Sequence, residues 1–231
     1  MARLPRRVAA RGSLELNIRR FRRRVSATPA AGMVRLGTHY GGWTVPTSLS
    51  ESSTVYLAGV GRDITFDLAL IARFGCTVHA FDPVPEAAEY ARAATQCEPR
   101  FVLHEAGLWS SDGTLRFYDH PEPEFISHSA TNMHATTTGF DAKVRSVDSL
   151  MAELGHSRLD LLKLSVEGSE YEIVRDVVAK GLDIGTLCVE FSQPAPIEPV
   201  VDTVRLLEEA GFVTTAVALP PYGWKLSFQR G

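Results

Sequence analysis

The sequence predicts an α/β fold built on a mostly parallel sheet with helices on both faces. Short apolar runs alternate with segments of helical periodicity from residue 54 onward, and this alternation is typical of a parallel sheet. A glycine-rich turn at 59–61 follows the first of these runs, as it does in sheets that bind nucleotides. The 231 residues are 45% hydrophobic and 22% charged, which excludes a disordered or fibrous chain.

Periodicity places the individual elements. We expect strands near 54–58, 77–81, 100–104, 160–165, 185–191, 212–218 and 224–228. We expect helices near 63–74, 84–96, 146–154, 169–180 and 197–210. The stretch 105–145 interrupts the alternation because it is rich in Ser, Thr, His, Pro and Gly, and it predicts a hairpin with a long loop. Long loops in compact domains are often functional, so this one is a candidate substrate wall.

Charge is distributed unevenly along the chain. Residues 1–35 hold ten Arg and one Glu, a net charge of +9, while the remainder carries −12 within a total of −3. We expect residues 1–35 to form a basic helix and linker, and residues 36–231 to form one folded domain. Ser13 is the expected cap of that helix. The basic segment is either a solvated helix packed on the domain or a contact for an anionic surface. Its expected apolar face consists of Leu14, Ile18, Phe21 and Val25.

Cysteine count, apolar run length and charge restrict the compartment and the partners. The three cysteines have neither the density of a disulfide scaffold nor the spacing of a zinc site, so we expect a cytoplasmic protein. The apolar runs are too short for stable insertion into a membrane. No nucleic-acid partner is expected, because phosphates would be repelled over much of an acidic domain. The oligomeric state is left open.

The glycine turn and the acid that ends the next strand predict a site for an adenosine-type ligand. Gly59 and Gly61 would let backbone N–H groups approach an anionic group near the start of a helix. Asp82 lies 23 residues after Gly59, close to the spacing at which an acid accepts ribose hydroxyls. Alternatively, the glycines only shape the turn and Asp82 caps the following helix.

The residue at position 64 indicates which class of ligand such a turn would bind. Ile64 stands where a dinucleotide fingerprint needs a third small residue, so a pyrophosphate is disfavoured and S-adenosylmethionine fits the pattern better. The candidate cofactor-binding residues are Gly59, Gly61, Asp63, Asp82, Glu105 and Ala106.

Three acids follow predicted strands at the edge where such sheets bind ligands. Glu167 lies in a Glu-Gly turn after the strand that ends at Ser165, and Glu190 ends the run TLCVEF. A carboxylate at the end of a buried strand is costly unless it is paired or functional. Glu170, in the first turn of the next helix, is equally well explained as a favourable helix-start charge. The candidate catalytic residues are Glu167, Glu170 and His39, with the loop residues His128 and His134 as further candidate bases.

The chain resembles the FkbM family of methyltransferases from about Thr38 to the C-terminus. The resemblance rests on the order and spacing of YGGW at 40–43, GVGRDITFDLALIARFGC at 59–76, VHAFDP at 78–83, SSDGTLRFY at 110–118 and LLKLSVEGSEYE at 161–172. It implies a Rossmann-like class I methyltransferase fold with a seven-stranded, mostly parallel sheet. It also implies S-adenosylmethionine bound at Gly59, Gly61 and Asp82, and O-methylation of a hydroxyl on a small-molecule, sugar or natural-product acceptor.

One departure from the family pattern affects the chemistry. The family commonly has an aspartate where this chain has Ser165. A divalent metal would need oxygen ligands from Glu167, Glu170 or Glu190, and without an acid at position 165 we assign none. Two alternatives therefore stay open: a binding protein that keeps the fold without the chemistry, and a nicotinamide-dependent oxidoreductase, which Ile64 disfavours.

Two aromatic residues of the YGGW segment have two interpretations. Tyr40 and Trp43 either face the sulfonium or the acceptor through cation–π contacts, or anchor the entry segment as core aromatics.

Overall fold

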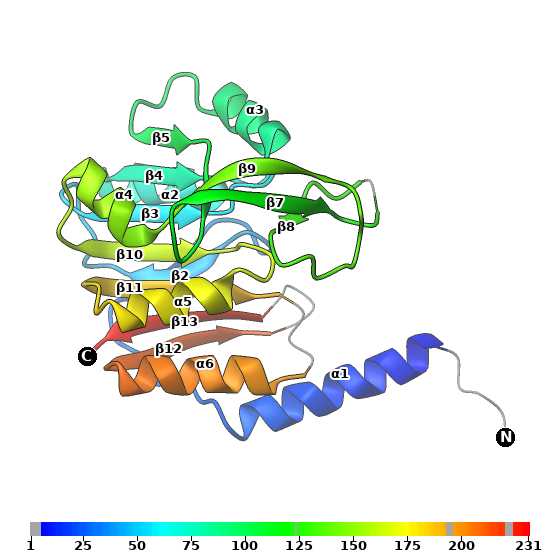
Figure 1. The fold of residues 1–231 in the computed structure, drawn as a ribbon. Coiled ribbons are helices and arrows are strands. Elements are labelled where there is room, and N and C mark those ends of the chain that lie inside the picture. Colours follow the sequence, from blue (N-terminus) through cyan, green and yellow to red (C-terminus); the bar gives the residue numbers. More distant parts are fainter. Residues whose placement is uncertain (1–5, 123, 193–195, 220–223) are drawn as a thin grey trace, which may run out of the picture.

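The computed structural model describes residues 6–122, 124–192, 196–219 and 224–231, with side chains from residue 14 onward. A seven-stranded sheet forms its centre, in the order β12-β13-β11-β10-β3-β4-β5 (Figure 1). All pairings are parallel except those of β13, which runs antiparallel to β11 and β12. The α/β prediction with a mostly parallel seven-stranded sheet is confirmed. The strands are β3 (Thr54–Ala58), β4 (Thr77–Phe81), β5 (Phe101–His104), β10 (Leu159–Leu164), β11 (Ile184–Phe191), β12 (Phe212–Ala218) and β13 (Trp224–Arg230).

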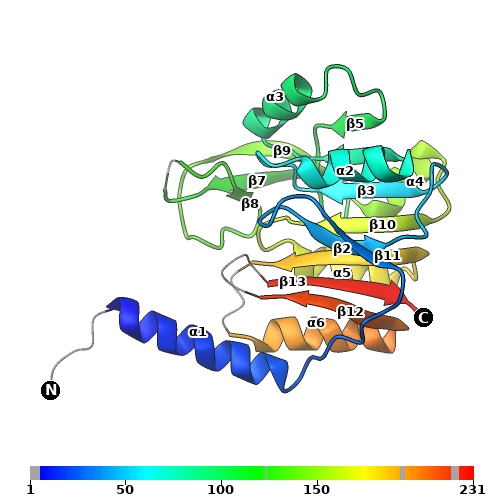
Figure 2. The ribbon, with the colours of Figure 1, turned by 180° about the vertical axis from the view of Figure 1, so that it is seen from behind.

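Helices cover both faces of the sheet, as Figures 1 and 2 show. One face carries α4 (Val147–Leu154), α5 (Glu170–Ala179) and α6 (Glu198–Glu209). The other carries α2 (Thr65–Phe74), α3 (Pro85–Ala94) and the hairpin of β1 (Met33–Leu36) and β2 (Trp43–Pro46). Successive side chains of a strand point to opposite faces, so Tyr56 packs with the first layer and Leu57 with the second.

The segment 105–145 forms a second, smaller sheet in the order β6-β9-β7-β8. Its centre is the predicted hairpin, in which β7 (Gly113–Asp119) pairs antiparallel with β9 (Gly139–Arg145). Between them runs the predicted long loop, which contains the two-residue strand β8 (His128–Ser129). Neither β8 nor β6 (Gly107–Leu108) was expected, because two residues are too few to show a period.

Helix α1 (Arg6–Arg22) precedes the sheet. The expected start at Ser13 is wrong, because Ala9, Ala10 and the arginines before Ser13 favour helix and extend it toward the N-terminus. Its C-terminal end is anchored: Phe21 is buried and its ring meets that of Trp224 edge to face at 4.9 Å. The rest of the helix projects beyond the body, on the side where the parallel strands end (Figure 1).

The strand order defines where a ligand can bind. Strands β3, β4, β10 and β11 run parallel and end at one edge. The order of the chain reverses between β3 and β10, and in open α/β sheets ligands bind in the crevice at such a reversal.

Candidate functional site

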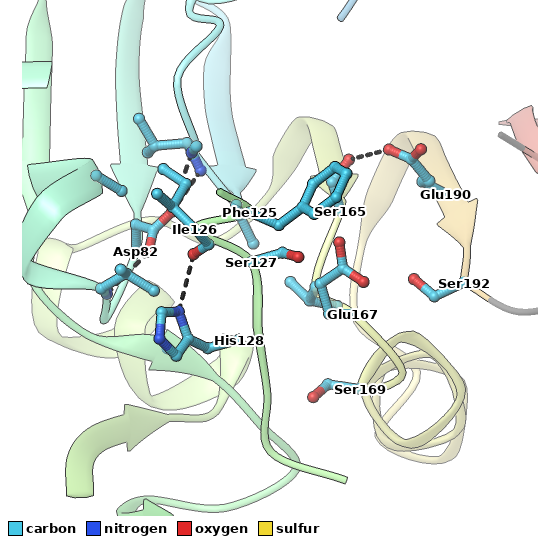
Figure 3. A pocket seen from close by; sticks show the side chains of 18 of the residues that line it. Asp82, Phe125, Ile126, Ser127, His128, Ser165, Glu167, Ser169, Glu190 and Ser192 are labelled. Atoms are coloured by element: carbon cyan, nitrogen blue, oxygen red, sulfur yellow. Dashed lines mark hydrogen bonds between the residues drawn. The ribbon is translucent and has the colours of Figure 1, made fainter. Parts of the chain in front are cut away.

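A cavity of about 700 Å³ opens at this edge, within the range of small-molecule and cofactor sites. Its walls come from the ends of the parallel strands, the start of β13, the 40–43 segment and the loop after β7. Figure 3 shows how the side chains of this loop face those that follow β10 and β11. The predicted residues Gly59, Gly61, Asp63, Asp82 and Glu167 line the cavity, as do Tyr40, Trp43, His128, His134, Ser165 and Glu190.

The glycine turn after β3 forms one half of the cavity. Gly59 and Gly61 are needed there for different reasons. Gly59 has φ +83°, and a Cβ there would lie 1.9 Å from the carbonyl oxygen of Ser165. Gly61 has φ +57°, but a Cβ there would meet no atom within 4 Å. Close contact with the neighbouring strand end therefore requires Gly59, whereas Gly61 faces open space that a ligand can use.

Asp82, at the end of β4, holds this turn in place. Its Oδ2 accepts hydrogen bonds from the N–H groups of Val60 at 2.8 Å and Gly61 at 3.2 Å, and its Oδ1 accepts one from Val84 at 2.9 Å. The side chain is almost fully buried, yet it lines the cavity. A carboxylate has about four acceptor positions, so Oδ1 keeps one for a ligand hydroxyl. The turn-shaping and ligand-binding interpretations of Asp82 are therefore compatible.

Asp63 connects the turn to the segment before β2. Its carboxylate accepts hydrogen bonds from the Thr38 hydroxyl and from both the N–H and the hydroxyl of Thr65. Burial opposes ionisation of this carboxyl, but the hydrogen bonds outweigh it and hold its pKa below the ordinary value. Asp63 is thus an ionised wall residue.

Sequence reasoning missed Lys163, a buried cation beneath the turn. It lies in β10, and its ammonium donates to the carbonyl oxygen of Gly59. Nearby Asp67 is also buried; burial raises its pKa to about 6, while Lys163 opposes the shift. A lysine inside the otherwise apolar run LLKL was the available signal.

Glu167 lies on the opposite side of the cavity, in a strained position. Its φ of +46° lies in the left-handed region, which is unfavourable for a residue with a side chain. Burial, and secondarily the charge of Glu190, raise its pKa. Among the described residues its carboxylate has no hydrogen bond or ion pair, although its carbonyl oxygen accepts one from Ser129 at 2.7 Å. In Figure 3 the side chain lies between Ser127 and Ser192. Within the described part of the chain, the cavity therefore holds a carboxylate of raised basicity that no side chain or N–H group engages.

Imidazoles from the loop after β7 line the same cavity, and the charge of one of them, His120, favours ionisation of Glu167. His120 and His134 line the cavity, with ring centroids 4.5 Å apart. His128 donates from Nδ1 to the carbonyl oxygen of Ile126 at 2.8 Å, and its Nε2 lies 3.3 Å from Asp119. His128 is thus oriented by two partners, which identifies it more readily as a wall residue than as a free base.

A partly buried chain of polar groups lies in the cavity wall between the two halves. The Ser165 hydroxyl donates to Oε2 of Glu190 at 3.0 Å, and Nζ of Lys225 lies 3.6 Å from the same oxygen. At the position where the family commonly has an acid, this chain therefore has a donor to Glu190.

Lys225 also explains the aromatic pair of the YGGW segment. Its ammonium lies 5.3 Å from the ring centroid of Tyr40 and 5.1 Å from that of Trp43, and it donates to the carbonyl oxygen of Tyr40. The cation on these rings is thus a lysine of the chain itself. Burial lowers the pKa of Lys225, with Glu190 opposing. The lysine in the buried strand WKLSF was the overlooked signal.

Four sequence-based candidates do not line the cavity. Glu170 is fully buried below it, and its carboxylate accepts from the N–H groups of Gly168 at 2.7 Å and Ser192 at 2.8 Å. Burial raises its pKa to about 7. Glu170 therefore holds the turn that carries Glu167 and cannot touch a ligand in this arrangement. The others are His39 and Glu105, both exposed, the latter paired with Arg92, and Ala106, which precedes the lining residue Gly107.

The described residues contain neither a metal-binding cluster nor a membrane-spanning helix. No group of three or more His, Cys, Asp or Glu side chains in this part of the chain is placed to hold a metal ion. None of the helices described here is long and apolar enough to cross a membrane.

Comparison with known proteins identifies the family. The "probable methyltransferase-like protein 24" of Homo sapiens is 27% identical over 143 residues, which cover 61% of this chain and 33% of that protein; the protein of the same name from Rattus norvegicus matches equally. This chain thus matches only a third of these curated relatives.

Among solved structures, the S-adenosylmethionine-bound fibrillarin of Aeropyrum pernix gives a TM-score of 0.48 at 8% identity, covering 88% of this chain and 85% of that one. A precorrin-6y C5,15-methyltransferase of Geobacter metallireducens gives 0.44 at 12%, covering 80% and 82%. Residues 58–214 match the profile of the methyltransferase FkbM domain, and this span contains the glycine turn, Asp82 and Glu167. The chain belongs to the FkbM methyltransferase domain family.

Proposed function

We propose that this domain transfers the methyl group of S-adenosylmethionine to a hydroxyl oxygen of a small-molecule, sugar or natural-product acceptor. The observation that carries the proposal is the division of one cavity into two halves: a glycine turn held by Asp82, and an unengaged carboxylate, Glu167. The first half suits a nucleoside and the second suits proton removal.

The residues of the turn fit the cofactor. Gly61 faces open space, and Asp82 keeps an acceptor position on Oδ1 for a ribose hydroxyl. The acids of the cavity suit a cation better than a polyanion. When bound, the cofactor would supply an electrophilic methyl group on a sulfonium.

Glu167 would take the proton of the acceptor hydroxyl onto a carboxylate oxygen. Its raised pKa makes it a stronger base than an exposed glutamate, and no partner among the described residues competes for its oxygens. The loop histidines and serines would orient the acceptor, since holding the two reactants in line can supply about 7 to 11 kcal/mol of the barrier. No step of this proposal requires a metal. We also keep as proposals a cytoplasmic location and the absence of a nucleic-acid acceptor.

Calorimetric titration with S-adenosylhomocysteine tests the cofactor half. Wild type should bind, and Gly61→Val should not, because its side chain would fill the open space of the turn. Glu105→Gln is the matched control and should bind like wild type, because Glu105 is exposed and lies outside the cavity. Absence of binding in wild type, or tight binding of NADH instead, would overturn the proposal.

Transfer of label from methyl-tritiated cofactor to an extract of candidate acceptors tests the other half. Glu167→Gln should bind S-adenosylhomocysteine normally but transfer label about 10² to 10⁴ times more slowly. Undiminished transfer by this variant would remove Glu167 as the base. Binding without transfer to any acceptor would favour the alternative that the domain is a non-catalytic binding protein.

A further inference from the structure

Most arginines of the domain have acidic partners, whereas among the described arginines at the end of helix α1 and just after it only Arg24 is paired, with Glu198 at 3.7 Å. Seven arginines of the domain form ion pairs with carboxylates, among them Arg62 with Glu86 and Arg158 with Asp183. Four arginines within five positions of the N-terminal segment are exposed, and no ion pair within the described residues engages them. They are Arg19, Arg20, Arg22 and Arg23. Such a cluster of uncompensated charge attracts an anionic partner.

This cluster is fixed to the domain at its C-terminal end. Phe21 and Val25 belong to the main hydrophobic core. Beyond them, the N–H of Thr28 donates to the carbonyl oxygen of Thr214 at 2.8 Å, which attaches the chain to the edge strand β12. The unpaired arginines therefore occupy a defined place relative to the sheet.

The arginine cluster lies on the side of the molecule where the cavity opens. Phe21 packs against Trp224, and Trp224 lines the cavity. Helix α1 also projects on the side of the molecule where the parallel strands end, as Figures 1 and 2 both show. On this side the cavity has two exposed aromatic wall residues, Tyr40 at 65% and Phe125 at 51% exposure. An extended surface that contacted the helix would thus approach the mouth of the cavity.

We propose that the arginines of the α1 segment bind an anionic lipid surface and direct the cavity toward it. Leu14 and Leu16 are exposed on the same helix. A lipid interface stabilises both such apolar side chains and arginines, whereas a nucleic-acid backbone stabilises only the arginines. The contact is peripheral, because Ile18, Phe21 and Val25 of the apolar face already pack against the domain. It does not depend on the proposed methyl transfer.

The strength of such binding follows from the number of free cations. Each Arg near an anionic bilayer contributes about a fivefold gain in affinity. Loss of all four would therefore weaken binding about 600-fold. Because the charges are exposed, added salt screens the attraction.

Co-sedimentation with vesicles tests the proposal on the full chain. The probes are phosphatidylcholine alone and phosphatidylcholine mixed with phosphatidylglycerol. One variant replaces Arg19, Arg20, Arg22 and Arg23 with Gln. Its control makes the same change of charge on the domain by replacing Arg92, Arg116, Arg175 and Arg205 with Gln, residues in exposed ion pairs that contribute little to stability.

We expect wild type and the control to bind only the anionic vesicles, with binding lost at high salt, and the α1 variant to bind about 600-fold more weakly. All three proteins should bind S-adenosylhomocysteine alike, which separates this result from the fate of the proposed function. Equal vesicle binding by the two variants would overturn the proposal. So would binding to neutral vesicles, or binding of an RNA oligonucleotide by wild type without binding to phosphatidylglycerol.

Discussion

The carboxylates in the two halves of the cavity have opposite environments. Asp82 accepts hydrogen bonds from three backbone N–H groups, two of which belong to the glycine turn. Glu167 has a raised pKa, a left-handed backbone and no engaged carboxylate oxygen among the described residues. Stabilisation is therefore concentrated where a cofactor would be recognised, and strain where a proton would be transferred. A binding half can be organised before its ligand arrives, while a reacting half needs a group that the fold has left unsatisfied.

The largest effect is expected from a substitution in the half of the cavity that Asp82 stabilises. Asp82→Ala leaves three N–H groups without their charged acceptor, so we expect the free energy of unfolding to fall by about 4 kcal/mol and affinity for S-adenosylhomocysteine to fall with it. Urea denaturation and calorimetry measure the two quantities.

Asp112→Ala is the matched control, because Asp112 also accepts a backbone N–H, from Ser146 at 2.9 Å, but is exposed and lies outside the cavity. It should cost about 1 kcal/mol and leave affinity unchanged. Similar losses in both variants would mean that Asp82 is an ordinary cap.

The contrast between the halves also explains what could be predicted from the sequence. The sheet, the glycine turn and Asp82 follow from local patterns, because period, glycine placement and acid spacing are written in short segments. Lys225 and Tyr40 meet across 185 positions, and Glu170 and Ser192 meet across 22. No local pattern encodes such contacts. The Glu-Gly turn after β10 therefore correctly predicted that Glu167 lies at the cavity. It could not show that Glu170, three residues later, lies beneath it.

A pH measurement sharpens the role of Glu170. Its pKa is about 7 in the fold against an ordinary 4.5. Between these values the unfolded chain ionises while the folded chain stays protonated, so stability is full below pH 4.5 and falls as the pH rises to 7. Replacement by Gln removes this titration.

We therefore expect Glu170→Gln to gain on the order of 3 kcal/mol relative to wild type between pH 4.5 and pH 7. Chemical denaturation at several pH values measures this difference, and all other groups titrate alike in both proteins. A constant difference across the range would show that Glu170 is ionised in the fold and not tuned by burial.

The smallest effect concerns the strain at Glu167. Glycine adopts φ +46° without the clash that a Cβ causes, so Glu167→Gly should stabilise the fold by about 1 kcal/mol while methyl transfer is lost. Ala135→Gly is the control, because Ala135 has φ +53° and does not line the cavity; it should give a similar gain in stability and keep transfer. Thermal unfolding compares the two.

A loss of stability in Glu167→Gly alone would mean that the carboxylate makes a stabilising contact. The halves of the cavity would then differ in chemistry but not in strain. A gain of stability in both variants, with methyl transfer lost only in Glu167→Gly, would show that the fold is strained at the residue proposed as the base.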